Sequence, residues 1–328
     1  MTMTEPKQTV LSLNSLIDKD QMFAPGHRLC AGCAAGTIAR LATMAVTRAT
    51  VVVNATGCLE VASTIYPYTA WKLPWLHNAF ENAAATASGV DAAFKALYRK
   101  GLYENEITDI IVFGGDGGTY DIGLQSLSGA VERGDDLLYI CYNNGGYMNT
   151  GIQRSSATMR GAETTTSPGG KIVPGKTQYS KDIMQIMIGH DIPYAATASP
   201  AYPKDFIEKV RKGLDVDGPA FILIDSPCPR GHRFDSHLTL EISRLGIDTC
   251  IFPIYDVVKG EYHLGKPSMK IARDPDKFKK EVISYFQAQG RFKHLFSHEK
   301  GKTIIDEIQA YIDRKWNLLL RMANVLSS

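Results

Sequence analysis

The sequence predicts an α/β fold in which a doubly wound, mostly parallel sheet is covered by helices on both faces. From about residue 50 onward, short apolar runs rich in Val and Ile alternate with stretches of helical spacing. Continuous apolar strands between helices are typical of parallel sheets whose two faces are both buried. The chain has 328 residues, of which 44% are hydrophobic, so it can bury a full core.

The expected strands cover residues 51–54, 109–113, 137–142, 194–198 and 220–225, and the expected helices cover 78–100, 124–133, 181–189 and 204–214. Residues 145–180 are rich in Gly, Ser and Thr, and so long a connection is typical of a functional or disordered loop. Residues 231–328 lack the alternation and end in two expected helices, near 275–289 and 302–325. We expect an α/β domain at 1–230, with the remainder as a helical C-terminal arm packed on partner chains or as a cap on the same domain.

Composition argues against two classes of partner and indicates a compartment. Lys and Arg number 36 against 34 Asp and Glu, a balance that gives no case for binding nucleic acid or a membrane surface. The first residues lack a basic start followed by an apolar core, and no stretch approaches the roughly 18 apolar residues of a membrane span. We expect a cytoplasmic, reducing location, where spaced cysteines are more often metal ligands or catalytic groups than disulfides.

Four polar or metal-binding residues follow expected strands. Cys58 comes after the first strand, Asp116 after the second, Asn144 after the third and Cys228 after the last. In open parallel sheets, ligands bind outside the carboxyl ends of the strands. We therefore expect these four side chains to share one edge of the sheet.

The run Gly114-Gly115-Asp116-Gly117-Gly118 joins an expected strand to an expected helix. Such a turn lets backbone N–H groups approach phosphate oxygens, although Gly-Asp-Gly is also a common turn. The carboxylate favours the functional interpretation, because Mg²⁺ prefers oxygen ligands and often bridges to phosphates. Asn144 can supply a second oxygen and Gly146 a backbone carbonyl. Gly-Asp-Gly followed at this distance by Asn is the signature of thiamine-diphosphate enzymes.

Four cysteines form a second constellation, with a CxxC pair at Cys30 and Cys33 and single residues at Cys58 and Cys228. Four thiolates can hold a [4Fe–4S] cluster or a zinc ion, and the spacing favours neither metal. The alternative is a redox pair or ordinary core cysteines. The remaining two cysteines, 141 and 250, lie in apolar surroundings typical of the core. The histidines near these segments (27, 77, 232 and 237) are not assigned as ligands while four cysteines suffice.

With these motifs in view, the chain resembles the β subunits of the 2-oxoacid:ferredoxin oxidoreductases, most closely those of the pyruvate type. The resemblance covers nearly the whole chain and rests on long motifs: GHRLCAGC at 26–33, NATGCLEV at 54–61, YPYTAWKLPWLHNAFENAAATASG at 66–89, GGDGGTYDIG at 114–123, YMNTGIQRSSAT at 147–158, SPCPRG at 226–231 and GRFKHLF at 290–296.

The resemblance implies a thiamine-diphosphate-binding fold and three bound groups. Thiamine diphosphate would contact Gly57, Gly115, Asp116, Gly117, Gly118, Asn144, Gly146, Tyr147, Asn149 and Thr150. Magnesium would be held by Asp116, Asn144 and the carbonyl of Gly146. A [4Fe–4S] cluster would be bound by Cys30, Cys33, Cys58 and Cys228. Asn149 is the side chain expected closest to the reacting carbon, and is therefore our candidate catalytic residue.

The resemblance also implies that the chain is active only with partners. An α-type subunit would supply the glutamate that activates thiamine and much of the 2-oxoacid pocket. A γ- or δ-type subunit or domain, itself ferredoxin-like, would carry further clusters and pass electrons to external ferredoxin. The expected reaction is the oxidative decarboxylation of a small 2-oxoacid in one-electron steps, with CoA taking the acyl group in most members. The rivals are a thiamine enzyme without electron transfer and a non-catalytic zinc-stabilised module.

One position departs from the family pattern. Gly145-Gly146 stands where an acidic and a small apolar residue are common before the tyrosine. Two glycines are expected to loosen the metal loop and enlarge the space near the cofactor. This suggests a substrate smaller and more charged than pyruvate, such as oxalate, from which only CO₂ would be released without CoA.

Overall fold

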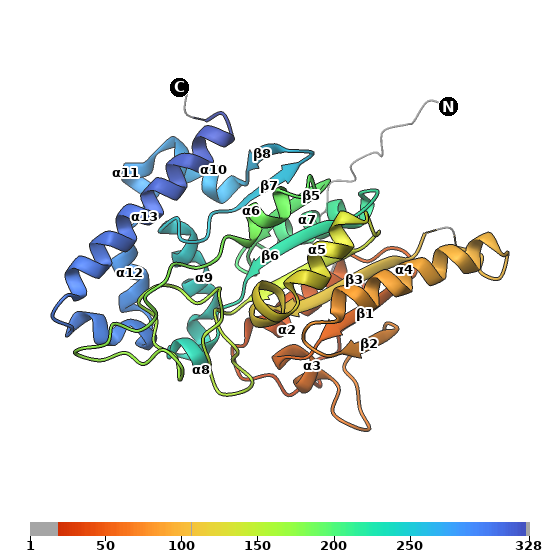
Figure 1. Ribbon diagram of the computed structural model, residues 1–328, viewed down its shortest axis with the longest axis horizontal. Helices are drawn as coiled ribbons and strands as arrows, with labels where there is room; N and C mark the ends of the chain where they lie inside the picture. The colour runs from red at the N-terminus through yellow and green to blue at the C-terminus, as the bar shows by residue number, and fades with distance from the viewer. Residues whose placement is uncertain (1–18, 106, 326–328) are drawn as a thin grey trace.

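The structure, a computed structural model that describes residues 19–105 and 107–325, is built around one eight-stranded sheet (Figure 1). The strands lie in the order β2-β1-β3-β4-β6-β5-β7-β8, and all neighbours are parallel except for the last two pairs. The strands are β1 (Thr50–Ala55), β2 (Trp75–Asn78), β3 (Asp109–Gly115), β4 (Leu138–Asn143), β5 (Tyr194–Ala198), β6 (Ala220–Asp225), β7 (Tyr255–Val258) and β8 (Glu261–Leu264).

The α-helices are α2 (Ala34–Met44), α3 (Cys58–Ser63), α4 (Ala83–Arg99), α5 (Leu124–Glu132), α6 (Ile183–Ile188), α7 (Pro203–Asp215), α8 (Pro229–His232), α9 (Thr239–Asp248), α10 (Lys266–Arg273), α11 (Pro275–Phe278), α12 (Val282–Gln287) and α13 (Gly301–Met322). A π-helix, η1, covers Gly117–Ile122, and two 3₁₀ segments, η2 and η3, cover Ser236–Leu238 and Gly290–Phe296. Helices α10 to α13 gather at one end of the molecule, and β2, α3 and α4 lie at the other (Figure 1).

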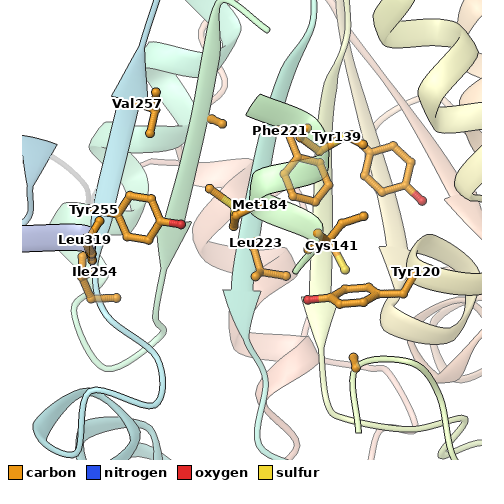
Figure 2. Close-up of a cluster of buried hydrophobic side chains, with 14 of the residues drawn as sticks. Tyr120, Tyr139, Cys141, Met184, Phe221, Leu223, Ile254, Tyr255, Val257 and Leu319 are labelled. Carbon is orange, nitrogen blue, oxygen red and sulfur yellow. The ribbon is translucent and has the colours of Figure 1, made fainter. Parts of the chain in front are cut away.

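Two hydrophobic cores explain why the strands read as continuous apolar runs. Successive residues of a strand point to opposite faces, so each central strand feeds both cores. Val52 and Ile111 join the core formed with α2 and α7, whereas Val53 and Val112 join the core formed with α4, α5, α6 and α13. Figure 2 shows part of the second core, in which the thiol of Cys141 lies among apolar side chains. The predicted doubly wound α/β fold is confirmed, as is the burial of Cys141 and Cys250.

The predicted strands are all present, but the sequence missed three others and several helices. Strands β7 and β8 are four residues each and form a hairpin through Lys259 and Gly260, whose φ angles are 48° and 85°. Such a short pair without an Asn-Gly turn gives little sequence signal. The single helix expected at 275–289 is two short ones, α11 and α12, separated at Lys279, where the backbone is extended.

The C-terminal region shares the sheet and the core with the rest of the chain. β7 pairs with β5, and α13 packs the side chains of Ile308, Ile312 and Leu319 into the second core. The predicted boundary at residue 230 thus falls within a continuous sheet, and the division into domain and arm stays a prediction. No helix among residues 19–105 and 107–325 is long and apolar enough to cross a membrane.

The connection expected at 145–180 contains no helix or strand, yet many hydrogen bonds hold it in place. The buried ammonium group of Lys176 donates to the backbone carbonyls of Ser155, Ser156 and Thr158 at 3.3, 3.1 and 2.6 Å. A single cation thus ties together three carbonyls of this connection through charge-assisted hydrogen bonds. The loop is therefore a built structure that packs over the carboxyl edge of the sheet.

Candidate functional site

The carboxyl ends of four adjacent strands carry the predicted site. β1, β3, β4 and β6 are consecutive neighbours in the sheet. Cys58 and Asp116 follow β1 and β3, while Asn144 and Cys228 follow β4 and β6. The prediction that these four residues share one edge is confirmed. This edge is the usual ligand-binding place of an open parallel sheet.

A cavity with an empty volume of about 330 Å³ lies at this edge. It is lined by nearly all of the positions expected to contact the cofactor, together with a few neighbours: Thr56, Gly57, Cys58, Phe80, Gly115, Gly117, Gly118, Tyr142, Asn144, Gly146, Tyr147, Met148, Asn149 and Thr150. The structure therefore brings the predicted contact residues together around one space.

Close packing explains two of the glycines that line the cavity. The ring of Tyr147 lies where a Cβ on Gly117 would stand, and the hydroxyl of Tyr147 donates to the Gly117 carbonyl at 3.0 Å. A Cβ on Gly57 would lie 2.5 Å from the hydroxyl of Tyr142. The turn after β3 enters a π-helix, a rare element that is frequent at functional sites.

Asp116 is fully buried and belongs to a tight group of oxygen atoms. Its Oδ1 accepts the Asn144 backbone N–H at 3.1 Å, and its Oδ2 accepts the Ser155 hydroxyl at 2.5 Å. The side-chain oxygen of Asn144 lies 2.8 Å from the Gly146 carbonyl oxygen and 2.9 Å from Asp116 Oδ1. Three oxygens that cannot donate hydrogen bonds to one another thus face each other.

That spacing has a simple chemical meaning. Oxygens on adjacent corners of a magnesium octahedron lie about 2.9 Å apart, because each Mg–O distance is about 2.0–2.1 Å. Turning the Asn144 amide over would instead let its nitrogen donate to both oxygens at the same distances. Either arrangement makes one compact group of the three predicted ligands, and the donor set is the one that Mg²⁺ prefers.

Burial raises the pKa of Asp116 to about 7, although the Ser155 hydroxyl and the Asn144 N–H both favour its ionised form. A carboxyl group in this position keeps its proton up to neutral pH unless a positive charge binds beside it. A cation at Asp116 would displace that proton, so its binding would be coupled to pH.

The segment Tyr147 to Thr150 lies along the cavity. The Thr150 hydroxyl donates to Gln153 Oε1 at 2.6 Å, and Gln153 Nε2 donates back to the Thr150 carbonyl at 2.7 Å. The side chain of Asn149 is exposed and makes no hydrogen bond within the described part of the chain. It is held in a fixed turn while its amide stays free to meet a ligand.

The four predicted cysteines come from three separate segments. Cys30 lies in a loop, Cys33 caps α2, Cys58 begins α3, and Cys228 caps α8 and accepts the Gly231 N–H at 3.3 Å. Burial raises the pKa of Cys33 to about 11 and that of Cys58 to about 12, and it also raises the pKa of Cys228. The negative charges of the other cysteines raise all three further, which puts the thiols in one neighbourhood.

No group of three or more His, Cys, Asp or Glu side chains in the described ranges is gathered closely enough to hold one metal ion. Ligands of a single zinc ion would have to lie within about 4 Å of each other, because a Zn–S bond is about 2.3 Å.

The CxxC loop is held by residues far away in the sequence. Gly32 has a φ of +72°, and a Cβ there would collide with the backbone carbonyl of Ser236. The Thr239 hydroxyl donates to the Gly32 carbonyl at 2.6 Å. Glycine is required here both by the positive φ and by the close approach of another segment.

Two functional neighbours were missed by the sequence. Ser155 contacts Asp116, as described above. His232 is buried, and its Nε2 donates to the Asn144 carbonyl at 2.6 Å, so the histidine fixes the loop that carries two of the predicted magnesium ligands. Burial and the charge of Arg291 lower the pKa of His232 well below its ordinary value, which keeps the ring neutral. His232 lies within the Cys228 turn, but a single histidine there gave no specific signal.

The glycine pair before Tyr147 does not enlarge the site, contrary to our expectation. Gly145 adopts a φ of +73°, and its carbonyl accepts the Thr158 hydroxyl at 2.8 Å. A Cβ on Gly146 would lie 2.9 Å from the Gln153 carbonyl oxygen and 3.2 Å from Met148 Cε. The space is thus filled by neighbouring atoms, and the glycines permit a tight loop rather than a loose one.

Comparison with known proteins points to one family. The family model described as the thiamine pyrophosphate enzyme C-terminal TPP-binding domain matches residues 55–224. The chain is 50% identical to the pyruvate synthase subunit PorB of Methanocaldococcus jannaschii, over 92% of this chain and 97% of that protein. It is 50% identical to the PorB subunit of Thermotoga maritima, with 94% of each covered.

A third relative is the ketoisovalerate oxidoreductase subunit VorB of Pyrococcus abyssi, 41% identical over 93% of this chain and 94% of that protein. The matched thiamine-binding range contains every residue expected to contact the diphosphate or magnesium, and it contains one of the four cysteines. Together with the fold, these matches show that the chain belongs to the family of β subunits of the thiamine-diphosphate-dependent 2-oxoacid:ferredoxin oxidoreductases.

Proposed function

We propose that this chain is the subunit of a pyruvate-type 2-oxoacid:ferredoxin oxidoreductase that holds thiamine diphosphate, Mg²⁺ and one [4Fe–4S] cluster side by side. The observation that carries the proposal is the compact group formed by Asp116, Asn144 and the Gly146 carbonyl, beside a cavity that is lined by the predicted glycines and by Cys58. The family fold supplies the context for this arrangement.

The Asp116 carboxylate, the Asn144 amide oxygen and the Gly146 carbonyl would hold Mg²⁺, and Gly115, Gly117 and Gly118 would leave room for the diphosphate. Ser155 and His232 would keep the first two ligands oriented, since partners of metal ligands fix ligand geometry. Tyr147 closes one wall by packing on Gly117.

Cys30, Cys33, Cys58 and Cys228 would bind the cluster. The family to which the chain belongs favours a cluster over a single zinc ion, because a ferredoxin-linked oxidoreductase must pass on electrons and zinc has no redox chemistry. The raised pKa values of Cys33 and Cys58 mean that the thiols must lose protons when iron binds. Amide N–H groups of Ala35 and Gly36 point at the Cys33 sulfur and favour its ionised form.

Thiamine diphosphate, when bound, supplies the electron sink that lets a 2-oxoacid lose CO₂. The chain's own residues orient the reactants and limit access of water. The free amide of Asn149 would donate to an oxygen of the substrate, and Met148 would separate it from the Cys228 turn, where its sulfur packs against Gly231. The adjacent cluster site would take electrons one at a time.

The names of the relatives favour pyruvate or a branched 2-oxoacid and do not favour oxalate. The packed loop at Gly145-Gly146 also removes the structural reason for a smaller substrate. We propose an α-type partner that completes the 2-oxoacid pocket, a ferredoxin-like partner that carries further clusters, CoA as acyl acceptor, external ferredoxin as electron acceptor, and a cytoplasmic location.

Anaerobic purification of the complex with its partner subunits, followed by iron, sulfide, zinc and thiamine analysis, tests the assignment. We expect a brown protein that contains thiamine. Its iron content should fall by about four atoms per copy of this chain when the four cysteines are replaced. Thiamine without such iron would favour a simple decarboxylase, and one zinc per chain without thiamine would favour the structural module. Turnover of pyruvate, 2-ketoisovalerate and oxalate by the same preparation ranks the substrates, and activity on oxalate alone would overturn the proposed class.

A further inference from the structure

Arg291, in η3, is a buried cation without an adequate partner. Its side chain belongs to a residue that is 4% exposed, and it forms no ion pair within residues 19–105 and 107–325. A guanidinium has five N–H donors, yet Nε has no partner and Nη2 makes one long bond of 3.4 Å to the Tyr285 hydroxyl. Burial of an unpaired charge is costly, so the site needs a negative charge that the polypeptide alone supplies poorly.

Arg291 lies near both the loop that carries Asn144 and Gly146 and the turn that carries Cys228. A Cβ on Gly145 would lie 3.0 Å from Arg291 Nη1 and 3.8 Å from His232 Nε2, so the guanidinium and the imidazole meet behind the metal loop. His232 in turn donates its backbone N–H to the Cys228 carbonyl at 2.8 Å. Arg291 is thus located where the metal loop and the Cys228 turn come together.

The carboxyl group of Asp225 is the neighbouring acidic group, and it compensates the charge of Arg291 only in part. The carboxyl of Asp225 accepts the Ser243 hydroxyl at 2.8 Å, and burial raises its pKa to about 7, so it is only partly ionised near neutral pH. Water in the adjoining cavity, which has an empty volume of about 1430 Å³, can satisfy N–H groups but carries no charge. Helix α8, which begins directly after Cys228, packs against η3, which carries Arg291, so the guanidinium lies beside the turn that holds this cysteine.

We propose that Arg291 is a positioning charge that raises the reduction potential of the cluster bound through Cys228. This inference rests on the proposed function, because it requires the cluster. When the cluster accepts one electron from oxidation of the 2-oxoacid, no protein bond forms or breaks and the cluster–thiolate group gains one negative charge. A fixed cation in a poorly polarisable interior stabilises the reduced form more than the oxidised form. Arg291 therefore makes the first electron transfer from the thiamine site more favourable.

The test is a redox titration of the assembled anaerobic complex with a chemical reductant, followed by electron paramagnetic resonance. The relevant signal is the one that disappears in a Cys58→Ala complex, which separates it from clusters on partner chains. We expect Arg291→Met to lower the equilibrium constant for reduction of this cluster about tenfold, which is a shift of about −59 mV for a one-electron couple. Arg291→Lys should keep most of the wild-type potential, because it keeps the charge.

Arg230→Met is the matched control, since Arg230 is two residues from Cys228 but is exposed to solvent that screens its charge. It should leave the potential unchanged. If Arg291→Met does not assemble, Arg291→Gln removes the charge while keeping N–H donors. An unchanged potential in an assembled neutral variant would overturn the inference. Absence of any Cys58-dependent signal in the wild-type complex would instead overturn the proposed function.

Discussion

The site has an oxygen half, formed by the predicted magnesium ligands, and a sulfur half, formed by the four cysteines. Hydrogen bonds within the chain order the oxygen half more completely than the sulfur half. In the oxygen half, Asp116 is fully buried, and its neighbours Asn144 and Ser155 already hold it at hydrogen-bond distance. In the sulfur half, Cys30 is exposed, and the other three thiols are only partly buried. Among the described residues, the backbone N–H of Cys33 donates to the Cys30 carbonyl at 3.0 Å, and no hydrogen bond joins the thiol of one cysteine to another cysteine.

The difference shows which half depends on its ligand. The oxygen half is preorganised by a network of protein hydrogen bonds, so binding costs little further ordering. The sulfur half carries thiols whose raised pKa values favour the neutral form, so cluster binding must displace their protons and join three segments of the chain. Substitutions in the two halves should therefore fail in different ways.

The largest effect is expected for Cys58→Ala, which removes a cluster ligand from the less preorganised half. We expect the complex to lose about four irons per copy of this chain and to lose its 2-oxoacid:ferredoxin activity, while thiamine binding remains. Iron and sulfide analysis and thiamine quantification measure the two halves separately.

Cys250→Ala is the matched control, because this thiol is buried in the apolar core. It should keep all its iron. A Cys58→Ala complex with its full iron content would contradict the assignment of the sulfur half.

The second largest effect is expected for Asp116→Asn, which alters the oxygen half. The amide cannot supply the negative charge that offsets Mg²⁺, and we expect at least about a 100-fold loss of affinity for magnesium and thiamine diphosphate, with the iron content unchanged. Isothermal calorimetry on the cofactor-depleted complex measures this loss.

The control substitution is at the other end of the same strand, where Asp109 is bound by Arg48 at 2.8 Å. Asp109→Asn should destabilise the fold yet leave magnesium affinity intact. Equal losses in both variants would mean that Asp116 acts only through stability.

A smaller effect is expected for His232→Leu, which leaves the Asn144 carbonyl without its donor. Loss of a partner that orients a ligand usually costs about 10–100-fold in metal affinity. Because His232 also lies in the Cys228 turn, this variant tests whether the two halves are mechanically joined, and the cluster signal should shift along with the magnesium dependence.

His237→Leu, an exposed histidine a few residues away, serves as its control and should change neither quantity. Partial recovery in His232→Gln, which restores an N–H donor, would support orientation as the role. If His232→Leu has the same magnesium dependence as the wild type, the loop keeps its conformation without the contact to His232.

The smallest effect is a pH dependence of stability in the metal-free complex. Burial raises the pKa of Asp116 and of Asp225 to about 7, so between about pH 4 and pH 7 the folded state binds more protons than the unfolded state. Stability should fall as pH rises through this window and level off above it. A change of 1 kcal/mol corresponds to about 2–4 °C in the unfolding temperature of a chain of this class.

Asp225→Asn should flatten part of this slope without affecting magnesium. Adding Mg²⁺ should flatten the part that belongs to Asp116, because the cation replaces its proton. Stability that rises between pH 4 and pH 7 in the metal-free complex would contradict both assignments.

The same contrast separates what could be predicted from the sequence from what could not. Asp116, Asn144 and Cys58 were found because continuous apolar runs mark the buried strands and functional residues follow the ends of those strands. Ser155 and His232 were missed, since each acts through one contact with a residue on another strand end. Such contacts depend on how loops pack, and no local pattern records them.

The hairpin of β7 and β8 was missed for a different reason. Two four-residue strands carry too few alternations to stand out, and tertiary pairing with β5 stabilises them. Likewise, the glycine pair at 145 and 146 was expected to loosen the metal loop, whereas in the folded chain it permits close contact with neighbouring atoms.

The bond from Thr239 to the carbonyl of Gly32 bears on the order of biosynthetic events. The first two cysteines leave the ribosome early, but the segment that fixes their loop is made more than 200 residues later. During synthesis the CxxC pair therefore lacks the contacts that shape it until most of the chain has emerged. Delivery of iron to this protein should accordingly follow folding of the nearly full-length chain, and Thr239→Val, which removes this one bond, should weaken retention of the metal cluster while leaving the thiamine site in place.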